Sequence, residues 1–319
     1  MAVTPAWTQP PPPWRDPSPH AVRFVAVEDG VRLEVLDWGG NGRPVVLLAG
    51  GGNTAHVFDE FAPKLATRYH VYGITRRGFG ASGFSAAENP VDRLRDDVLA
   101  VMASLKLERP VLAGHSIAGA ELSAVAAARP DRIAGLVYLE AGYPYAFTVR
   151  DGPRMNEFQI SGPPFPRPGA SHRASFRSLQ RWDAGVYGFR IPEAEFRQIW
   201  DADGAGRPEQ PREAPGSQLF AALMATSAPF TRIPVPALVV FANPHVPERW
   251  IGRSADPRVR QAARTYFAAI DASTQKQANA LGAAAPTVRV VRLRASHYVF
   301  LSNEHETLRE TRAFLGTLK

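Results

Sequence analysis

The chain has 319 residues, of which 45% are hydrophobic and 21% charged, a composition typical of globular proteins and not of disordered ones. It contains no cysteine, which excludes disulfides, thiolate metal sites and a cysteine nucleophile. The net charge of +7 is scattered along the chain without a recognisable nucleic-acid-binding motif, so no nucleic-acid partner is expected. No apolar run approaches the roughly 18 residues of a membrane span, so we expect a soluble protein.

The first twenty residues contain a cluster of prolines and are predicted to form an extended arm outside the core. They lack the apolar stretch of a signal peptide. The compartment therefore stays open: the protein is either cytoplasmic or exported with a leader already removed. Composition also leaves open the oligomeric state and any function of the arm.

Apolar runs rich in β-branched residues recur along the chain and predict eight strands. Asp29 and Gly30, between the first two runs, favour a hairpin, so the sheet should begin antiparallel. Later runs alternate with helical patterns, as at 90–107 and 118–130, which predicts an α/β fold whose mostly parallel sheet carries helices on both faces. The expected strands are 21–27, 31–38, 44–50, 69–75, 110–115, 133–140, 236–242 and 287–293.

This alternation stops between the sixth and seventh expected strands. The intervening stretch is too long for a simple loop and carries helical patterns at 175–189 and 192–200. We predict that it is an inserted, mainly helical cap whose aromatic residues line an apolar pocket, among them Tyr143, Tyr145 and Trp182. The expected division is an arm of residues 1–20, a core of 21–142 and 234–319, and a cap of 143–233.

The octapeptide AGHSIAGA (113–120) lies where the fifth expected strand meets a helical pattern. Ser116 follows Gly114 by two residues, as in the G-x-S-x-G nucleophile elbow, but Ala118 replaces the second glycine. The elbow is so tight that the neighbours of the serine must be small, a requirement that alanine also meets. Ser116 is therefore a candidate nucleophile; the alternative is a serine that only caps the helix.

With this elbow the chain resembles the α/β-hydrolase superfamily, from the first expected strand to the C-terminus, the cap excepted. The resemblance implies an α/β-hydrolase fold. It also makes the segment LLAGGGNTAHVFDEF (47–61) similar to the oxyanion loop of the superfamily, with Ala49 in place of a frequent histidine. The oxyanion would then be held by the N–H groups of Ile117 and Gly51, with Gly52 as a one-residue alternative. Otherwise the three glycines only form a tight turn.

His297, in RASHYVFLSNE, lies between the last expected strand and a helical pattern at 308–318, where the superfamily places its catalytic base. An imidazole can accept the serine proton and return it to the leaving group. The chain order of serine, acid and histidine also fits. Other histidines compete poorly, because His115 would point away from the nucleophile, His70 lies in a strand and His20 lies in the arm.

The acid of the expected triad departs from the commonest superfamily pattern. Asn243 and His245 stand after the seventh expected strand, where most members carry an aspartate, and neither supplies a negative charge. Glu140 ends the sixth expected strand and resembles the acid of haloalkane dehalogenases and of the zearalenone lactonase group. We predict Glu140 as the acid and keep Glu248 in reserve; alternatively Glu140 only pairs with an arginine.

The segment RRGFGASG matches G-x-G-x-x-G at Gly78, Gly80 and Gly83. No helix opens on it, so no dinucleotide site is expected. It resembles the D-x-R-G-x-G-x-S segment of α/β hydrolases, with Thr75 replacing the aspartate, and we assign it to turn geometry.

Together these residues predict a serine hydrolase that needs no cofactor and no metal. It would cleave a carboxylic ester with an apolar or aromatic part through an acyl-enzyme. The small-molecule substrate is alternatively a lactone, or the triad serves another acyl transfer. A further alternative is a non-catalytic protein that binds a ligand under the cap, because a fold alone does not determine function.

Overall fold

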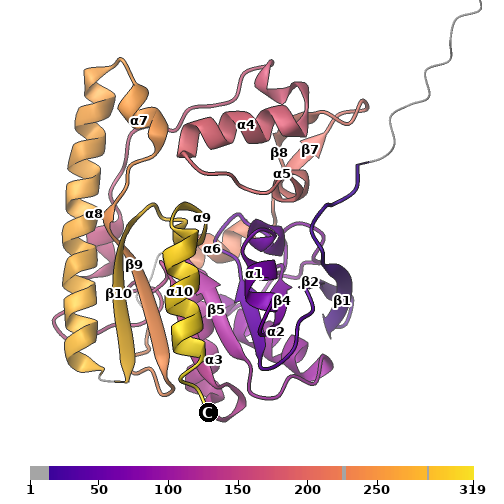
Figure 1. Cartoon of the computed structure of the whole chain (residues 1–319), viewed down its shortest axis with the longest axis vertical. Coiled ribbons are helices and arrows are strands. Elements are labelled where there is room, and N and C mark those ends of the chain that lie inside the picture. Colours follow the sequence, from indigo (N-terminus) through magenta and orange to yellow (C-terminus); the bar gives the residue numbers. More distant parts are fainter. Residues whose placement is uncertain (1–13, 225–227, 286) are drawn as a thin grey trace, which may run out of the picture.

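The computed structural model describes residues 14–224, 228–285 and 287–319. At its centre is an eight-stranded sheet in the order β1-β2-β4-β3-β5-β6-β9-β10 (Figure 1). All eight expected strands are present, which confirms the predicted sheet. They are β1 (Ala21–Glu28), β2 (Val31–Asp37), β3 (Pro44–Leu48), β4 (His70–Ile74), β5 (Val111–His115), β6 (Gly135–Leu139), β9 (Ala237–His245) and β10 (Val288–Ala295).

The pairing of the strands follows the sequence pattern. β1 and β2 are antiparallel, and Gly30 between them has a positive φ of 73°, which glycine adopts without strain. β2 also runs antiparallel to β4, and the remaining pairs are parallel. β5 and β6 are buried along their whole length, which explains their continuous apolar sequences. The parallel strands therefore end at one edge of the sheet, where residues that follow them meet.

Helices cover both faces of the sheet. One face packs against α2, α3 and α8 through residues such as Leu94, Leu122 and Leu281. The other packs against η1, α1, α9 and α10, through residues such as Leu65 and Phe314. These elements are η1 (Ala55–Phe58), α1 (Ala62–Ala66), α2 (Pro90–Ser104), α3 (Ala118–Ala128), α8 (Pro257–Ala284), α9 (Val299–Ser302) and α10 (Glu304–Leu315); the short η2 (Pro130–Arg132) precedes β6.

The long helix α8 is not predicted by the sequence analysis. It begins cleanly, because the side chain of Asp256 accepts a hydrogen bond from the backbone N–H of Arg258, and Pro257 occupies the first turn. Only a narrow stripe of it is buried, including Ile270, Ala278 and Leu281. The helical spacing of apolar residues is therefore weak in the sequence. The structure shows the helix packed beside β9 and β10.

The segment between β6 and β9 lies over the carboxyl edge of the sheet (Figure 1). It contains the helices expected near 175–189 and 192–200, together with a two-stranded hairpin that was not expected. Helix α7 (Arg249–Arg253), which follows β9, packs against α4, so this upper layer also includes residues beyond 233. Its elements are η3 (Met155–Phe158), η4 (His172–Ala174), α4 (Phe176–Tyr187), α5 (Glu193–Ile199), β7 (Trp200–Ala202), β8 (Pro208–Pro211) and α6 (Ser217–Met224). The boundaries of the cap at 143 and 233 remain a proposal.

The N-terminal arm corrects one expectation. Residues 1–13 lie outside the described residues, but residues 14–20 contact the rest of the protein and do not lie free of it. The Arg197 guanidinium lies over the Trp14 ring, 4.4 Å from its centroid, and His20 hydrogen bonds to Asp59. Polar side chains of the arm thus find partners on α5 and beside α1, which a proline-rich composition does not reveal.

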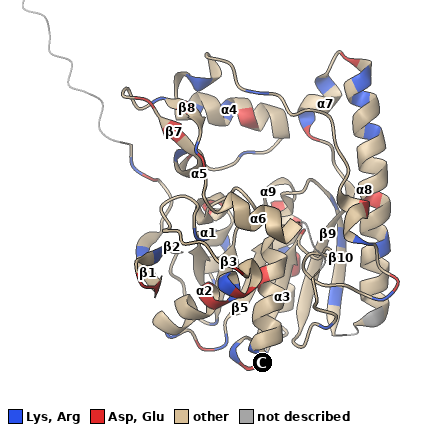
Figure 2. Cartoon of the chain, turned by 180° about the vertical axis from the view of Figure 1, so that it is seen from behind, with Lys and Arg blue, Asp and Glu red and all other residues tan. Residues whose placement is uncertain are grey.

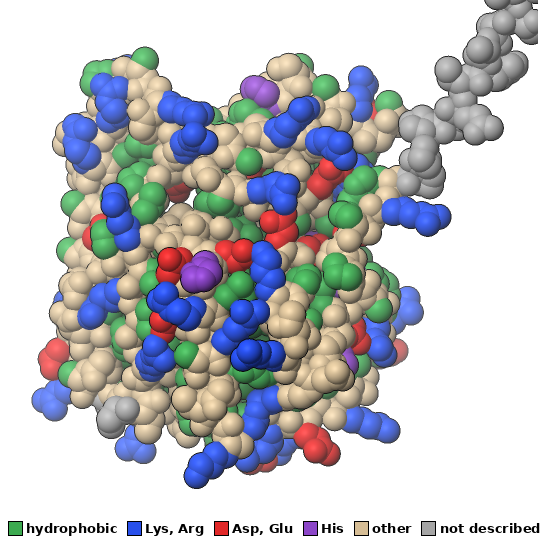
Figure 3. All heavy atoms as spheres, in the orientation of Figure 1, with side chains coloured by type: hydrophobic (Ala, Val, Ile, Leu, Met, Phe, Trp, Pro, Cys, Tyr) green, Lys and Arg blue, Asp and Glu red, His purple; other side chains and the backbone are tan. Residues whose placement is uncertain are grey.

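Charged side chains are scattered over the surface. Figures 2 and 3 show basic residues distributed among acidic ones on the faces drawn. Among the described residues, no helix combines the length and apolar character needed to cross a membrane.

Candidate active site

Ser116 occupies the turn between β5 and α3. Its φ is 53°, a left-handed conformation that is uncommon for a residue with a side chain. Its N–H donates to the carbonyl of Leu139 on β6 at 3.2 Å, which holds the turn against the sheet edge. Strain of this kind at a strand-to-helix turn is typical of functional positions. The local geometry is that of an elbow that exposes the serine hydroxyl.

The neighbours of Ser116 show where this turn needs small residues. A Cβ added at Gly119 would lie 2.1 Å from the carbonyl oxygen of Ala141, and this backbone atom cannot move aside as a flexible side chain could. A Cβ added at Gly114 would lie 2.9 Å from the existing Cβ of Ala118. Ala118 is thus tolerated because Gly114 has no side chain, and the departure from G-x-S-x-G has a steric explanation.

The loop after β3 lies directly against the elbow. A Cβ at Gly50 would come 3.3 Å from the Cβ of Ser116, so this backbone passes beside the hydroxyl. Within the described ranges, the N–H groups of Gly51 and Ile117 donate to no protein acceptor. Ile117 also begins α3, whose N-terminal dipole favours negative charge. Both groups are therefore available to an oxyanion. The N–H of Gly52 also donates to no acceptor among the described residues, so Gly52 stays the one-residue alternative to Gly51.

Arg76 holds this loop in place from below. Its guanidinium donates to the carbonyl oxygens of Ala49 and Gly50, at 2.7 and 3.2 Å, and pairs with the buried carboxylate of Glu121 on α3. The carbonyl of Gly50 and the N–H of Gly51 belong to one peptide group and point in opposite directions. Because Arg76 holds this carbonyl, the N–H of Gly51 points away from Arg76. From the sequence, RRGFGASG is assigned to turn geometry alone, and the contacts of Arg76 with the loop after β3 are not predicted.

His297 lies in the loop between β10 and α9 and borders the same cavity as Ser116. His115 supports it from behind, since Nε2 of His115 hydrogen bonds to the carbonyl oxygen of His297 at 3.0 Å. Burial lowers the pKa of His115 to about 4, so its ring is neutral and donates. The ring of His297 reaches solvent inside the cavity, but desolvation under the upper layer lowers the pKa of His297 well below 6.5.

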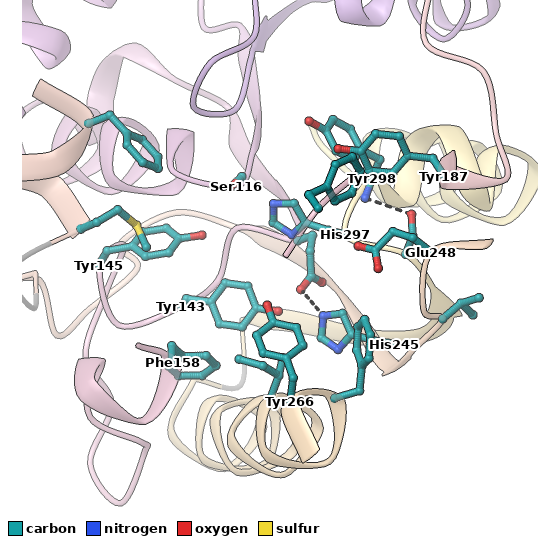
Figure 4. A pocket seen from close by; sticks show the side chains of 18 of the residues that line it. Ser116, Tyr143, Tyr145, Phe158, Tyr187, His245, Glu248, Tyr266, His297 and Tyr298 are labelled. Atoms are coloured by element: carbon teal, nitrogen blue, oxygen red, sulfur yellow. Dashed lines mark hydrogen bonds and ion pairs between the residues drawn. The ribbon is translucent and has the colours of Figure 1, made fainter. Parts of the chain in front are cut away.

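Glu140 is fully buried at the end of β6 and also has a left-handed backbone, with a φ of 51°. Its carboxylate accepts a hydrogen bond from the backbone N–H of Ala242 and lies 3.2 Å from Nε2 of His245 (Figure 4). Nδ1 of His245 lies 2.7 Å from the carboxylate of Asp271 on α8. Glu140 is thus held by the backbone N–H of Ala242 and by the imidazole of His245 on β9.

The pKa values of His245 and Glu140 reflect both their burial and their contact with each other. Burial opposes a charge on His245, but hydrogen bonds to Asp271 and Glu140 raise the pKa of His245 to about 9. Burial also raises the pKa of Glu140, which the His245 partner opposes. His245 is therefore the cationic member of the cluster, and its imidazole links Glu140 to Asp271 beside the cavity.

Ser116, Glu140 and His297 all border one cavity of about 450 Å³. Within the described residues, His297 makes no hydrogen bond to either of the other two. Catalytic hydrogen bonds of unliganded enzymes are often long and tighten only around substrate. Figure 4 shows Ser116 and His297 on one side of the cavity and His245 on the other.

Aromatic side chains dominate the remaining wall of the cavity. Tyr143 and Tyr145 line it, whereas the ring of Trp182 lies elsewhere and stacks on His172 with centroids 5.7 Å apart. Trp182 and Tyr187 are both on α4 but point about 140° apart around the helix, and only Tyr187 faces the cavity. Others in the wall are Phe158, Phe165, Phe220, Tyr266, Phe267 and Tyr298.

Tyr145 lines the cavity together with Ser116. Burial raises the pKa of Tyr145 well above 10, and the nearby side chain of Ser116 acts in the opposite direction. The hydroxyl of Tyr145 is thus neutral and beside the serine. The ring of Phe220 covers Gly51, because a Cβ there would come within 2.2 Å of it. Both side chains shape the space in which an acyl group would sit.

Glu195 connects the upper layer to the oxyanion loop. Its fully buried carboxylate, on α5, accepts hydrogen bonds from Nδ2 of Asn53 and from the N–H of Thr54, each at 3.0 Å. Asn53 in turn accepts a hydrogen bond from the hydroxyl of Tyr298, next to His297. Burial raises the pKa of Glu195 to about 7, although Thr54 and Asn53 favour its charged form. One carboxylate therefore holds the segment that follows Gly51.

We expect Glu195→Gln to lower the free energy of unfolding by about 1–3 kcal/mol, because an amide cannot accept all the hydrogen bonds that converge on the carboxylate. Urea unfolding measures this change. Glu193→Gln is the matched control on the same helix; its ion pair with Arg197 is partly exposed, so a change within about 0.5 kcal/mol is expected. Equal effects of the two substitutions would contradict this function of Glu195.

A family model described as "Alpha/beta hydrolase family" matches residues 45–310. The chain is 29% identical over 177 residues to a non-heme haloperoxidase of Rhodococcus erythropolis, covering 55% of this chain and 64% of the relative. It is 29% identical over 135 residues to a bifunctional esterase/perhydrolase of Acinetobacter calcoaceticus, covering 41% and 48%. The chain spans about half the length of the curated relatives it matches.

The fold is also that of solved structures. The crystal structure of an E-2-(acetamidomethylene)succinate hydrolase superposes with a TM-score of 0.65 and covers 93% of this chain and 100% of that chain. The sequence identity is 17%, so this likeness bears on the fold alone.

Proposed function

Because the chain belongs to the alpha/beta hydrolase family, we propose that it is a serine hydrolase with Ser116 as nucleophile, His297 as base and Glu140 as acid. The observation that carries this proposal is the strained turn at Ser116, beside the loop after β3; within the described part of the chain, the N–H groups of Gly51 and Ile117 donate to no protein acceptor. A serine that merely caps a helix needs neither feature. The proposal thus starts from backbone geometry and not from the motif alone.

In the proposed reaction, the hydroxyl of Ser116 attacks the carbonyl carbon of the substrate while His297 takes its proton. The resulting oxyanion is stabilised by the N–H groups of Gly51 and Ile117. His297 then protonates the leaving group, and a water molecule, activated in the same way, releases the acyl group. The negative charge of Glu140 stabilises His297 each time the imidazole is protonated.

We propose a carboxylic ester with an apolar or aromatic part as the substrate class, with a lactone as the alternative. The aromatic wall of the cavity supports this choice, since such sites bind apolar groups and orient them through a few polar atoms. Water attack on a serine ether would not regenerate the enzyme, so a serine nucleophile argues for acyl transfer and against epoxide opening. Other acyl transfers share the same machinery.

Labelling with a fluorophosphonate probe tests the proposal. We expect covalent modification of Ser116 in the folded protein, together with hydrolysis of short-chain p-nitrophenyl esters. A non-catalytic protein that binds a ligand in the cavity would leave Ser116 unlabelled and hydrolyse no ester. That outcome would overturn the enzymatic proposal and favour the ligand-binding alternative.

The pH dependence of kcat/KM supplies a further prediction. The base must be neutral to accept the serine proton, and desolvation lowers the pKa of His297 well below 6.5. The acid limb of kcat/KM should therefore fall below pH 6.5, so activity persists in mildly acidic solution. Initial rates measured by pH-stat with an uncharged ester check this. An inflection at or above pH 6.5 would mean that His297 is not desolvated in this way.

A further inference from the structure

Four side chains outside the active-site cavity converge where the N-terminal arm meets the core. Asp16 and His20 come from the arm, and His56 and Asp59 come from η1 and the residue that follows it. A donor atom of each lies within 4.8 Å of a donor atom of every other. The side chains of His20, His56 and Asp59 are only 3–4% exposed, and that of Asp16 is 21% exposed.

We propose that these four residues form a binding site for a divalent transition metal ion, with Zn²⁺ as the best fit. Imidazole nitrogens and carboxylate oxygens are common zinc ligands, and tetrahedral bonds of about 2.0–2.1 Å place neighbouring ligand atoms roughly 3.3 Å apart. Nδ1 of His56 lies 3.1 Å from Asp59 and 3.3 Å from Asp16. Nδ1 of His20 lies 2.9 Å from Asp59, and Nε2 of His20 lies 3.8 Å from Asp16. Only one nitrogen of His20 can bind the ion, so the four ligand atoms lie within reach of one another, and small side-chain rotations would complete the site.

The surroundings of the four residues also fit a metal site. Nε2 of His56 is buried without a hydrogen-bond partner among the described residues, and the nearest carboxylate oxygen, from Glu34, is 3.6 Å away. A histidine that binds a metal through one nitrogen commonly directs the other toward a carboxylate. The indole N–H of Trp38 donates to Asp59 at 3.2 Å and so orients a second ligand.

Metal binding requires neutral imidazoles. A divalent ion would therefore take the place of the proton that His56 shares with Asp16 and Asp59, and it would balance the charge of two carboxylate ligands. Four protein ligands would leave no open position, so the ion would be structural and not catalytic. It would attach residues 16–20 to η1, which lies within the segment 47–61, and the partly exposed Asp16 gives the ion access from solvent. The alternative is that hydrogen bonds between the histidines and the aspartates hold the same side chains together without a metal ion.

The sequence predicts a metal-free protein and does not indicate this site. The spacings D-x-x-x-H at 16–20 and H-x-x-D at 56–59 are short and common, and nothing in the sequence joins them. The proposal does not depend on the hydrolase reaction.

Zinc binding by the purified full chain tests this inference. After treatment with EDTA and dialysis, titration with Zn²⁺ against a chromophoric chelator should show one tight site per chain, and zinc should raise the thermal unfolding midpoint. His20→Asn removes a ligand from the arm and should weaken binding by more than about 100-fold, the upper effect of losing a mere supporting group. His305→Asn, at an exposed histidine on α10, is the matched control and should leave zinc binding unchanged.

A second measurement protects the test against misfolding of the variant. In the wild-type chain, hydrogen exchange at the backbone amides of Asp16, Ser18 and His20 should slow when Zn²⁺ is added and return to its earlier rate with EDTA; residues 17 and 19 are prolines and carry no amide hydrogen. Absence of tight binding, or equal binding by wild type and His20→Asn, would overturn the proposal. The four side chains would then be a proton-linked cluster, with any zinc held elsewhere.

Discussion

Replacing Ser116 by alanine is expected to lower kcat/KM for a p-nitrophenyl ester by a factor on the order of 10⁴ or more. The change removes the nucleophile, and neither His297 nor the oxyanion donors can form the acyl-enzyme without it. The fold should persist, because the two backbone hydrogen bonds of Ser116 do not involve its hydroxyl: its N–H donates to Leu139, and its carbonyl oxygen accepts from the N–H of Gly119. Steady-state kinetics and the thermal unfolding midpoint together check the prediction.

Ser123→Ala is the matched control for the loss of a serine hydroxyl. Ser123 lies two turns along α3 and hydrogen bonds to the hydroxyl of Tyr138 inside the core. Its removal should cost stability, about 1–3 kcal/mol, because it leaves the tyrosine hydroxyl unpaired. Activity per folded molecule should be unchanged. If Ser116→Ala kept most of the activity, the reaction would have to use another nucleophile, and the proposed acyl-enzyme would be wrong.

The fold was largely predictable because its strands carry strong local patterns. β5 and β6 are buried on both faces and read as unbroken apolar runs, and the Asp29-Gly30 turn specifies the first hairpin. Helix α8 was missed because only one narrow stripe of it is buried. The β7-β8 hairpin was missed because its strands are short and largely exposed. In both, tertiary contacts supply the stability that local sequence does not.

The residues of the candidate site also fall into those that the sequence indicates and those that only the structure brings together. Ser116 and His297 were identifiable from a motif and from their places after strands, and the structure puts both on one cavity. The support of the oxyanion loop by Arg76 and Glu195 depends on contacts between segments far apart in the sequence. His245 was considered only as an unsuitable acid, whereas its contact with Glu140 makes it a partner of the acid. Such pairings become visible only when the sheet edge is assembled.

Glu140→Gln is expected to lower kcat by a factor on the order of 10³–10⁴, with little change in KM. A neutral amide removes the negative charge that stabilises His297 when it is protonated, but it keeps the size of the side chain. Its carbonyl oxygen can still accept the hydrogen bond from Ala242, so the fold should be retained. Rates at saturating ester separate kcat from KM, and circular dichroism checks the fold.

Glu248→Gln provides the decisive comparison, because Glu248 follows β9, where the superfamily's commonest acid stands, and also borders the cavity. Its carboxylate is partly exposed, whereas that of Glu140 is fully buried and fixed by Ala242 and His245. A buried, oriented charge acts more strongly on an imidazolium than a solvated one does. We therefore expect Glu248→Gln to reduce kcat less than tenfold. A large loss in Glu248→Gln beside full activity in Glu140→Gln would assign the acid to Glu248 and reduce the cluster of Glu140, His245 and Asp271 to a structural role.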